Sequence, residues 1–527
     1  MLLLGGAIVT LRAQSMWDAY NFSQTTYYGT AKSVALGNAM TAVGGDLGSL
    51  TLNPAGSAVA PYSTFVLTPA ITVTTTNTMG QALQGQNSPY AFQNSETDYR
   101  TRFKMPNFGL MLNMDTGKAR GLRNWSFGFV GNATHNYQNM IFGSGTNEDT
   151  SLAGALATAA GGYSSASLNA DWFDTSYNPL PSWQSMAAYK AALIDTYGVS
   201  DSDYIGVTER LLPDGSIDVY GLLDQEYSSR RSGNKYDLLT NLAFNISDRF
   251  FFGFNMGITS LSFRNEEIWL EAASANPFVL EFGTGDVLHF EKLRMRYSYE
   301  ADGAGIYAKA GFLWRITNGL RIGAAIQSPT AFGITERYVQ DAKTEFTENV
   351  YEAKSPQGEW SYDFRSPWSY NVGLAWTIGS FAMLSADYEY TDYSIMKFRA
   401  HHDDYYDFSY VNSDIKQYMG AMHSLRAGLE VRPIPALAIR GGYNYSTHPQ
   451  LEYVNGDRSA FSFGLGYSSA GSFFADLAVR LNYLPEEHLN IYSDYIYDAD
   501  NNLVMPSPTV NINTTLVDAL VTVGWRF

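Results

Sequence analysis

The C-terminal end of the chain alternates apolar and polar positions, which predicts a β-strand with different surroundings on its two faces. Counting back from Phe527, the apolar positions are Trp525, Val523, Val521, Ala519 and Val517. The intervening positions are Arg526, Gly524, Thr522, Leu520 and Asp518. Because successive strand side chains point to opposite faces, this pattern suits a membrane barrel, where lipid meets one face and the lumen the other. We interpret residues 515–527 as the closing strand of a barrel; a C-terminal strand of a soluble sandwich is the alternative.

The same two-faced alternation recurs along the chain, for example in residues 250–264, 359–378 and 459–469. Fourteen strands are expected. Their ranges are 62–76, 101–114, 124–138, 234–246, 250–264, 288–316, 319–338, 359–378, 381–394, 421–432, 435–446, 459–469, 472–484 and 515–527. The even number treats residues 288–316 as one strand with a bulge or kink at Gly303 and Gly305, because glycine within a strand commonly marks one.

The lengths of the connections alternate between short and long. Residues 247–249, 317–318, 379–380, 433–434 and 470–471 are tight turns, whereas 139–233 and the other intervening segments are long. Short periplasmic turns and long extracellular loops are typical of outer-membrane barrels. The fold class is therefore predicted as all-β, a transmembrane antiparallel barrel over residues 61–527. Within 139–233 we expect short helices at residues 150–160 and after Ser182.

The composition supports this class and excludes others. Aromatic residues make up 15% of the 527 residues and charged residues only 16%, below the roughly 25% of soluble domains. The mean hydropathy of −0.18 and the absence of long apolar runs argue against a spanning helix. No cysteine is present, which excludes disulfides and thiolate metal sites. The net charge of −17 argues against a nucleic-acid partner.

The region before the first strand divides into two parts. Residues 1–13, MLLLGGAIVTLRA, resemble a signal peptide that lacks a basic start and is therefore weak or truncated; a first buried strand is the alternative. Residues 14–60 contain many small residues, the acid Asp46, and then Asn53-Pro54-Ala55-Gly56. We expect this segment to plug the lumen as a hatch, since a barrel of this size must be filled or remain open; a periplasmic tail is the alternative.

This N-terminal pattern resembles the hatch of the FadL/TodX family of outer-membrane transporters of hydrophobic compounds, in a form like that of Bacteroidetes. The segments 303–330, 367–368 and 387–393 add to the resemblance. It implies passive uptake of long-chain fatty acids or other hydrophobic small molecules, which leave sideways through a gap in the barrel wall. It also implies that the mature N-terminus, residues 14–18, reaches the ligand pocket. Candidate gap positions are Gly303 and Gly305, or Gly128 and Gly131.

The expected partners follow from this class of protein. They are a hydrophobic ligand, outer-membrane lipid or lipopolysaccharide, and the barrel-assembly machinery, which would recognise Trp525 and Phe527 as the insertion signal. A monomer is expected, located in the bacterial outer membrane. The alternative function is a FadL-like scaffold or adaptor barrel for protein secretion or surface assembly.

We expect no enzyme activity, no catalytic residues and no cofactor. His401, His402, Asp403 and Asp404 could in principle bind a metal, but a solvated loop tip is the better interpretation, and no metal is expected. An outer-membrane enzyme would need a nucleophile and base pair, and the sequence offers no recognisable motif for one.

Overall fold

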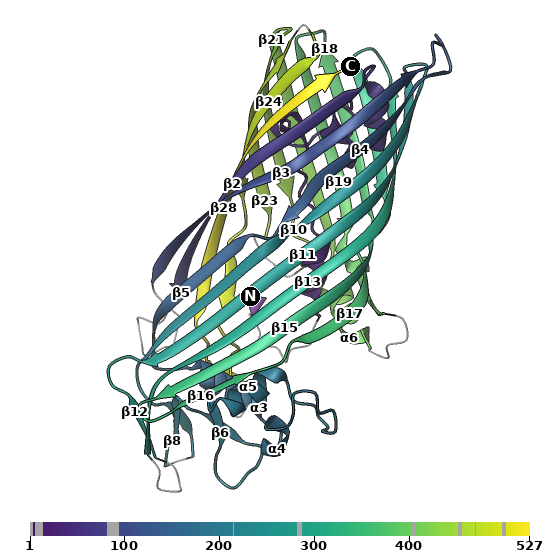
Figure 1. The fold of residues 1–527 in the computed structure, drawn as a ribbon. Helices are drawn as coiled ribbons and strands as arrows, with labels where there is room; N and C mark the ends of the chain where they lie inside the picture. Colours follow the sequence, from purple (N-terminus) through teal and green to yellow (C-terminus); the bar gives the residue numbers. More distant parts are fainter. Residues whose placement is uncertain are drawn as a thin grey trace.

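The computed structural model is a tall, closed, antiparallel barrel (Figure 1). It describes residues 4–5, 14–81, 94–213, 215–281, 287–401, 407–451, 456–469, 471–497 and 502–527. Residues 1–13, the expected signal peptide, lie outside this description apart from β1 (Leu4–Gly5), which pairs with β25 (Glu487–Asn490). His402, Asp403 and Asp404 also lie outside the described residues.

Fourteen wall strands form the barrel, as predicted. Several of them are assigned in two successive parts. In chain order they are β2 (Thr64–Gln81), β3 (Ser95–Asp115), β4 (Leu122–Asn136) with β5 (Asn139–Asn147), β10 (Leu223–Ile246), β11 (Phe250–Ala273), β13 (Val287–Arg315), β14 (Leu320–Gln327) with β15 (Ala331–Phe346), β17 (Gly358–Arg365) with β18 (Ser369–Ile378), β19 (Ala382–Asp392) with β20 (Lys397–Ala400), β21 (Ala421–Ile434), β22 (Leu437–Ser446), β23 (Arg458–Ser468), β24 (Phe473–Tyr483) and β28 (Thr509–Arg526).

The barrel closes where the sequence ends. β28 pairs with β24 on one side and with β2 on the other, with Trp525 opposite Phe65 and Phe473. The Phe65 and Trp525 rings stack with centroids 6.3 Å apart. The last residue continues this seam, because the backbone N–H groups of Ser63 and Phe527 each donate to the other's carbonyl. The closing strand expected from the C-terminal alternation is therefore the first-to-last seam of the barrel.

The break expected at Gly303 and Gly305 is absent from the wall. Both glycines pair without a register shift, with Leu261 and Thr259 on β11 and with Ile334 and Phe332 on β15. Continuous pairing on both edges holds β13 straight through this stretch, so the bulge interpretation is wrong although the single long strand is correct. Two other predicted strands are interrupted instead, at residues 328–330 and 366–368, where Pro329 and Pro367 lack the N–H that pairing needs.

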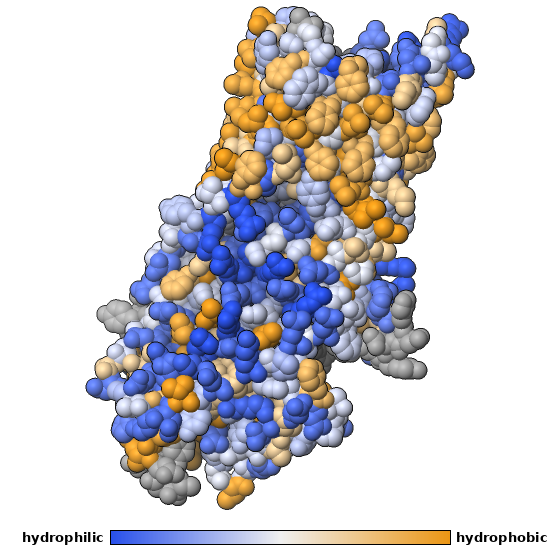
Figure 2. All heavy atoms as spheres, viewed as in Figure 1, coloured by the Kyte–Doolittle hydropathy of each residue, from blue (hydrophilic) through white to orange (hydrophobic). Residues whose placement is uncertain are grey.

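The outer surface of the barrel has two zones along its height. Large exposed apolar side chains gather at the end where the chain terminates, and charged residues cover the other half (Figure 2). On β10 the outward side chains change from Asp224, Glu226 and Arg230 to Leu238 and Leu242. The apolar zone is the membrane-spanning band, and the charged zone is an extension of the barrel outside the membrane. Among the described residues, no helix is long and apolar enough to cross a membrane.

Residues 148–222 form a lid over the far end of the extension (Figure 1). They contain the two expected helices, one of them begun by Ser182, whose side chain accepts from the Ser185 N–H. The elements are α3 (Leu152–Ala160), α4 (Ser165–Leu168), α5 (Trp183–Lys190), β6 (Ile194–Thr196), β7 (Tyr204–Gly206), β8 (Glu209–Leu211) and β9 (Ile217–Val219). Apolar lid residues pack on the inner faces of β10, β11, β13 and β15 to make one core.

The remaining elements complete the outer end. They are β12 (Phe278–Glu281), β16 (Val350–Lys354), η3 (Tyr393–Ile395), α6 (Ser409–Tyr418), β26 (Ile496–Tyr497) and β27 (Leu503–Met505). α6 and η3 pack on the aromatic side chains of the extension.

Candidate functional site

The hatch, residues 14–60, lies inside the barrel and is buried along most of its length. Its elements are α1 (Met16–Ser23), α2 (Ala31–Ala35), η1 (Leu47–Thr51) and η2 (Pro54–Val59). Each has a side-chain cap, provided in order by Ser15, Thr30, Asp46 and Asn53. These caps explain why a segment rich in glycine and alanine holds a defined shape: side chains satisfy the free N–H groups of each short helix.

The residues singled out in the hatch sequence anchor it internally and to the wall. Asn53 is fully buried and donates from Nδ2 to the carbonyls of Thr41 (2.7 Å) and Phe312 (3.0 Å). Pro54 begins η2, and its carbonyl accepts from Asn241 Nδ2 (3.0 Å). Asp46 Oδ1 accepts from Thr30 Oγ1 (2.6 Å).

Gly56 closes the same fold of the hatch. Its carbonyl accepts from the Gly45 N–H (2.8 Å), and its Cα lies against Gly44.

Glycines of the wall provide the seat on which the hatch packs. A Cβ added to Gly428 would lie 2.7 Å from the Leu36 carbonyl oxygen, and one added to Gly464 would lie 2.5 Å from Ala35 Cβ. Gly253, Gly311, Gly323, Gly373 and Gly442 also face hatch atoms at distances too short for a Cβ. These glycines were visible in the sequence as the small positions of the alternating strands. Their role as a seat was missed, because the sequence of a strand does not show which distant segment packs against it.

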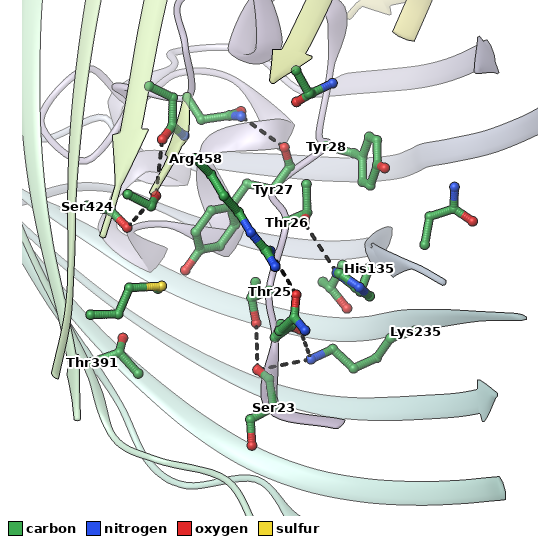
Figure 3. Close-up of a pocket in the computed structure, with 18 of the residues that line it drawn as sticks. Ser23, Thr25, Thr26, Tyr27, Tyr28, His135, Lys235, Thr391, Ser424 and Arg458 are labelled. Atoms are coloured by element: carbon green, nitrogen blue, oxygen red, sulfur yellow. Dashed lines mark hydrogen bonds between the residues drawn. The ribbon is translucent and has the colours of Figure 1, made fainter. Parts of the chain in front are cut away.

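A cavity of about 270 Å³ lies on the outer side of the hatch (Figure 3). Polar and charged side chains line much of it, and five of them are cations: Arg231, Lys235, Arg426, Arg458 and Arg480. Arg426 pairs with Glu389, and Arg480 pairs with Asp518 at 2.9 Å. Arg231, Lys235 and Arg458 make no ion pair among the described residues. We call this space the polar cavity.

Two of these three cations contact the hatch backbone and amides instead of carboxylates. Lys235 Nζ donates to the carbonyls of Phe22 (3.2 Å), Ser23 (3.3 Å) and Gln24, at the C-terminal end of α1. Arg458 donates to Gln24 Oε1 at 2.8 Å. Figure 3 shows both side chains converging on the chain between Ser23 and Thr25. A lysine at this end of a helix interacts favourably with its carbonyls, and the Asp237 carboxyl group, which lines the same cavity, also attracts it.

An aromatic chamber adjoins the polar cavity in the extension of the barrel. We define it by the buried residues of the wall strands, of η3 and α6 and of their flanking segments that pack around α1: Tyr137, Leu261, Phe263, Tyr299, Phe332, Ile334, Tyr362, Phe364, Tyr393, Met396, Phe398, Phe408, Val411, Ile415 and Met419. Ala19, Tyr20 and Phe22 of α1 fill it. The two spaces share Tyr137, Phe263, Phe332 and Tyr393. Helix α1 thus occupies the apolar interior of the extension, and residues 14–18 lie at its N-terminal end.

One polar group is enclosed in this chamber. Glu336 on β15 has no exposed surface and accepts hydrogen bonds from Tyr299 Oη (2.6 Å), Tyr362 Oη and Gln14 Nε2 (3.1 Å). Its neighbours on the outer face of β15, such as Arg337, are charged, which places it in the extension. Burial, with the nearby Asp18 carboxylate, raises the pKa of Glu336 to about 8.

The wall beside the polar cavity has an interruption in strand pairing. β3 pairs with β4 from Asp115 to Asn107, opposite Asn124 to Asn132, and the pairing of these two strands ends there. On the other edge of β4, where it pairs with β10, Lys235 lies opposite His135 and Tyr236 lies opposite Ala133, so Thr134 is bulged. Residues 134–139 line the cavity at this point. Gly128 and Gly131 themselves are paired on both edges, one to four residues short of the interruption.

Comparison with known proteins places this arrangement in a known architecture. No protein-family model and no curated protein matches the chain. A Pseudomonas aeruginosa FadL homologue superimposes with a TM-score of 0.52 at 13% identity, covering 96% of this chain and 100% of the other. This barrel has the FadL/TodX fold. The Pseudomonas putida toluene transporter TodX gives a TM-score of 0.50 at 12% identity, covering 95% and 98% of the two chains.

The FadL/TodX fold locates the chain in the bacterial outer membrane, with its short turns and C-terminus on the periplasmic side. The extension and its lid therefore stand on the extracellular side. In the described part of the chain, no group of three or more His, Asp or Glu side chains is arranged to hold a metal ion.

Proposed function

We propose that the protein takes up hydrophobic small molecules with an anionic head, long-chain fatty acids above all, across the outer membrane. The observation that carries this proposal is the polar cavity with three unpaired cations, directly joined to the aromatic chamber. A carboxylate leaving water requires a cation or several hydrogen-bond donors, and an acyl chain requires an apolar surface. A monoaromatic hydrocarbon, as carried by the toluene transporter TodX, would not need the cations.

Binding of such a ligand requires α1 to leave the chamber, at least in part. The helix is short, with eight residues, and isolated helices of this length are marginal in water. Each methylene of an acyl chain that enters the chamber contributes about 0.8 kcal/mol. A chain of ten methylenes therefore contributes about 8 kcal/mol towards replacing the apolar side chains of α1. The cations would bind the carboxylate in place of the helix carbonyls.

The lateral exit proposed for the ligand is the interruption between β3 and β4. Release into water would oppose transport by the same 0.8 kcal/mol per methylene, whereas release into lipid conserves that free energy. The bulged Thr134 and the lining residues 134–139 bring the polar cavity to this part of the wall.

Uptake of labelled oleate by cells that lack other fatty-acid transporters tests the main proposal. The double variant Lys235→Met, Arg458→Met should bind oleate more weakly but retain its affinity for oleyl alcohol, which has no charge. Arg264→Met, an exposed cation of the outer face that pairs with Glu300, is the matched control. Uptake independent of the protein would overturn the proposal, and equal losses for oleate and oleyl alcohol would overturn the role of the cations.

Deletion of Thr134 tests the exit separately. Without the bulged residue the pairing of β4 can continue in register, so oleate should still bind but its uptake should fall. Unchanged uptake by this variant, folded and at equal abundance, would rule out this exit.

The lid favours a second candidate, a scaffold or adaptor barrel. It closes the extracellular end with its own core and presents a surface of about 75 residues outside the membrane. Co-purification of a stoichiometric surface or secretion protein that is lost when residues 150–220 are removed, with oleate uptake unaffected, would support this function.

A further inference from the structure

Helix α1 lies between two polar contacts of opposite character. Its C-terminal end meets the cations Lys235 and Arg458, and the Gln14 carboxamide just before its N-terminal cap meets the carboxyl group of Glu336. Between these ends, aromatic and aliphatic side chains of the chamber pack on Ala19, Tyr20 and Phe22, and Asp18 accepts hydrogen bonds from the Ser15 N–H and hydroxyl at the start of the helix. The chain's own N-terminal segment thus shows what this space accepts: carbonyl oxygens at one end, an apolar body, and a hydrogen-bond donor at the other end.

The separation of the two polar ends can be measured in two ways. Along the helix, the nine residue steps from Gln14 to Ser23 correspond to about 14 Å. Along the wall, Glu336 pairs with Ala301, Ala301 with Phe263, and Phe263 with Gly233, two residues from Lys235. Three strand spacings and two residue steps correspond to about 14 Å across and about 7 Å along the strands. The two routes agree on about 15 Å.

We propose that the preferred substrate is a long-chain fatty acid with a hydroxyl group near the middle of its chain, and that Glu336, with Tyr299 and Tyr362, is the residue set that selects it. The carboxylate would bind at Lys235 and Arg458, as in the proposed function on which this inference rests. The hydroxyl would replace Gln14 Nε2 as the donor to Glu336. An extended chain covers about 1.2 Å per bond, and 15 Å minus about 6 Å for the two hydrogen bonds leaves about 9 Å, or seven to eight bonds, which places the hydroxyl near carbons 8 and 9.

The selection follows from the cost of leaving a buried polar group unpaired. Glu336 receives two tyrosine hydroxyls on Oε1, and its Oε2 receives Gln14 alone among the described hydrogen-bond partners. When α1 leaves, an unsubstituted acyl chain would cover Oε2 without offering it a partner. A hydroxyl at the right carbon restores the hydrogen bond. Sites that hydrogen-bond a substrate hydroxyl reject the analogue that lacks it, because their own group is then left unsatisfied.

Competition against labelled oleate, measured with the purified full chain, tests this selection. The competitors are stearate, 2-hydroxystearate, 8-hydroxystearate and 9-hydroxystearate. The wild-type protein should bind the 8- or 9-hydroxy acid on the order of tenfold more tightly than stearate. 2-Hydroxystearate should show no such gain, because its hydroxyl lies beside the carboxylate. Equal affinity of all four acids would overturn the inference and leave the proposed function standing, whereas no binding of any acid would overturn the proposed function.

Variants locate the effect. Glu336→Leu should remove the preference for the hydroxy acids while stearate binding is kept or improved, since no polar group then remains unpaired. Glu271→Gln, which alters another buried carboxyl under the lid, is the matched control and should keep the preference. If Glu336→Leu does not fold, the pair Tyr299→Phe and Tyr362→Phe takes its place and should change the hydroxy-to-stearate ratio. A ratio unchanged in every folded variant would show that Glu336 does not select the ligand.

Discussion

The contact between the hatch and the wall at Gly442 can be tested with a pair of adjacent glycines. Gly442 on β22 faces the Leu36-Gly37 turn, and a Cβ there would lie 2.5 Å from the Leu36 carbonyl carbon and 2.7 Å from Gly37 Cα. Ordinary contact begins at 3.4 Å, so the Leu36 carbonyl carbon lies about 0.9 Å too close, and the Gly37 nitrogen lies closer still. The turn cannot adapt easily, because Gly37 has φ +61° and its own Cβ position lies 2.8 Å from Tyr443 backbone atoms. The change Gly442→Ala must therefore push the hatch off the wall or bend β22.

The expected penalty is that of overpacking, about 1–3 kcal/mol. If the hatch yields, the free energy of its local opening falls by this amount, and its amides should exchange hydrogen roughly 5- to 150-fold faster. Mass spectrometry of exchange in peptides from residues 31–60 measures this. Gly441→Ala is the control, because a Cβ at Gly441 meets no atom within 4 Å. Equal hatch exchange in the two variants, with barrel peptides unchanged, would refute the seating of the hatch on wall glycines.

Three further predictions concern other parts of the molecule. Burial raises the pKa of Glu271, which accepts from the Leu152 N–H at the start of α3 (2.5 Å), to about 7. This pKa lies above the unfolded value of about 4.5, so the stability of the lid should be greatest at acid pH and should fall by about 3 kcal/mol as the pH rises from 4.5 through 7. Cleavage of the lid by proteinase K should therefore increase from pH 5 to pH 8 in the wild type. The increase should be much smaller in Glu271→Gln. Tyr28→Leu removes a ring whose centroid lies 3.8 Å from Lys104 Nζ and 4.6 Å from the Arg480 guanidinium. Loss of these cation–π contacts should weaken hatch docking by about 1–2 kcal/mol, which would be measured as faster hydrogen exchange in residues 24–35. Unchanged hydrogen exchange would exclude a role of Tyr28 in docking. Removal of Phe527 should lower the amount of folded, heat-modifiable protein in the outer membrane without changing transcript level, whereas normal assembly would show that the insertion signal lies elsewhere.

The membrane-spanning part of the barrel could be predicted because each strand there separates lipid from lumen, so that apolar and polar side chains alternate along it. The prediction stopped early where the surroundings change. β10 begins at Leu223 and β11 ends at Ala273, although residues 223–233 and 265–273 were taken as connections. In that extension the alternation continues with its polarity reversed, as Gln225 and Tyr227 point inward and Glu226 and Arg230 outward. A search for period-two alternation of either polarity would have found it.

The candidate site was less predictable than the fold. The hatch motif identified the segment 14–60, but the wall glycines, the three unpaired cations and Glu336 come from strands far apart in the sequence. Nothing local distinguishes Glu336 from the other acids of residues 331–346, because its burial depends on Tyr299, Tyr362 and Gln14. The candidate gap positions Gly128 and Gly131 are themselves paired, although they lie near the interruption beside Thr134.

The extension of the barrel has a consequence for how the cell surface is crossed. The outward charged stretch of β10, Asp224 to Asn234, corresponds to about 33 Å of strand, or roughly 25 Å of height at the tilt of a barrel strand. The aromatic chamber and Glu336 are thus raised above the lipid surface, into the aqueous layer outside the membrane. For a hydrophobic molecule, the free-energy cost lies in crossing this aqueous layer and not in entering the hydrocarbon interior of the membrane. Under the proposed uptake, the extension therefore holds the binding space within that layer, beneath the lid, and shields the ligand from water before it reaches the membrane.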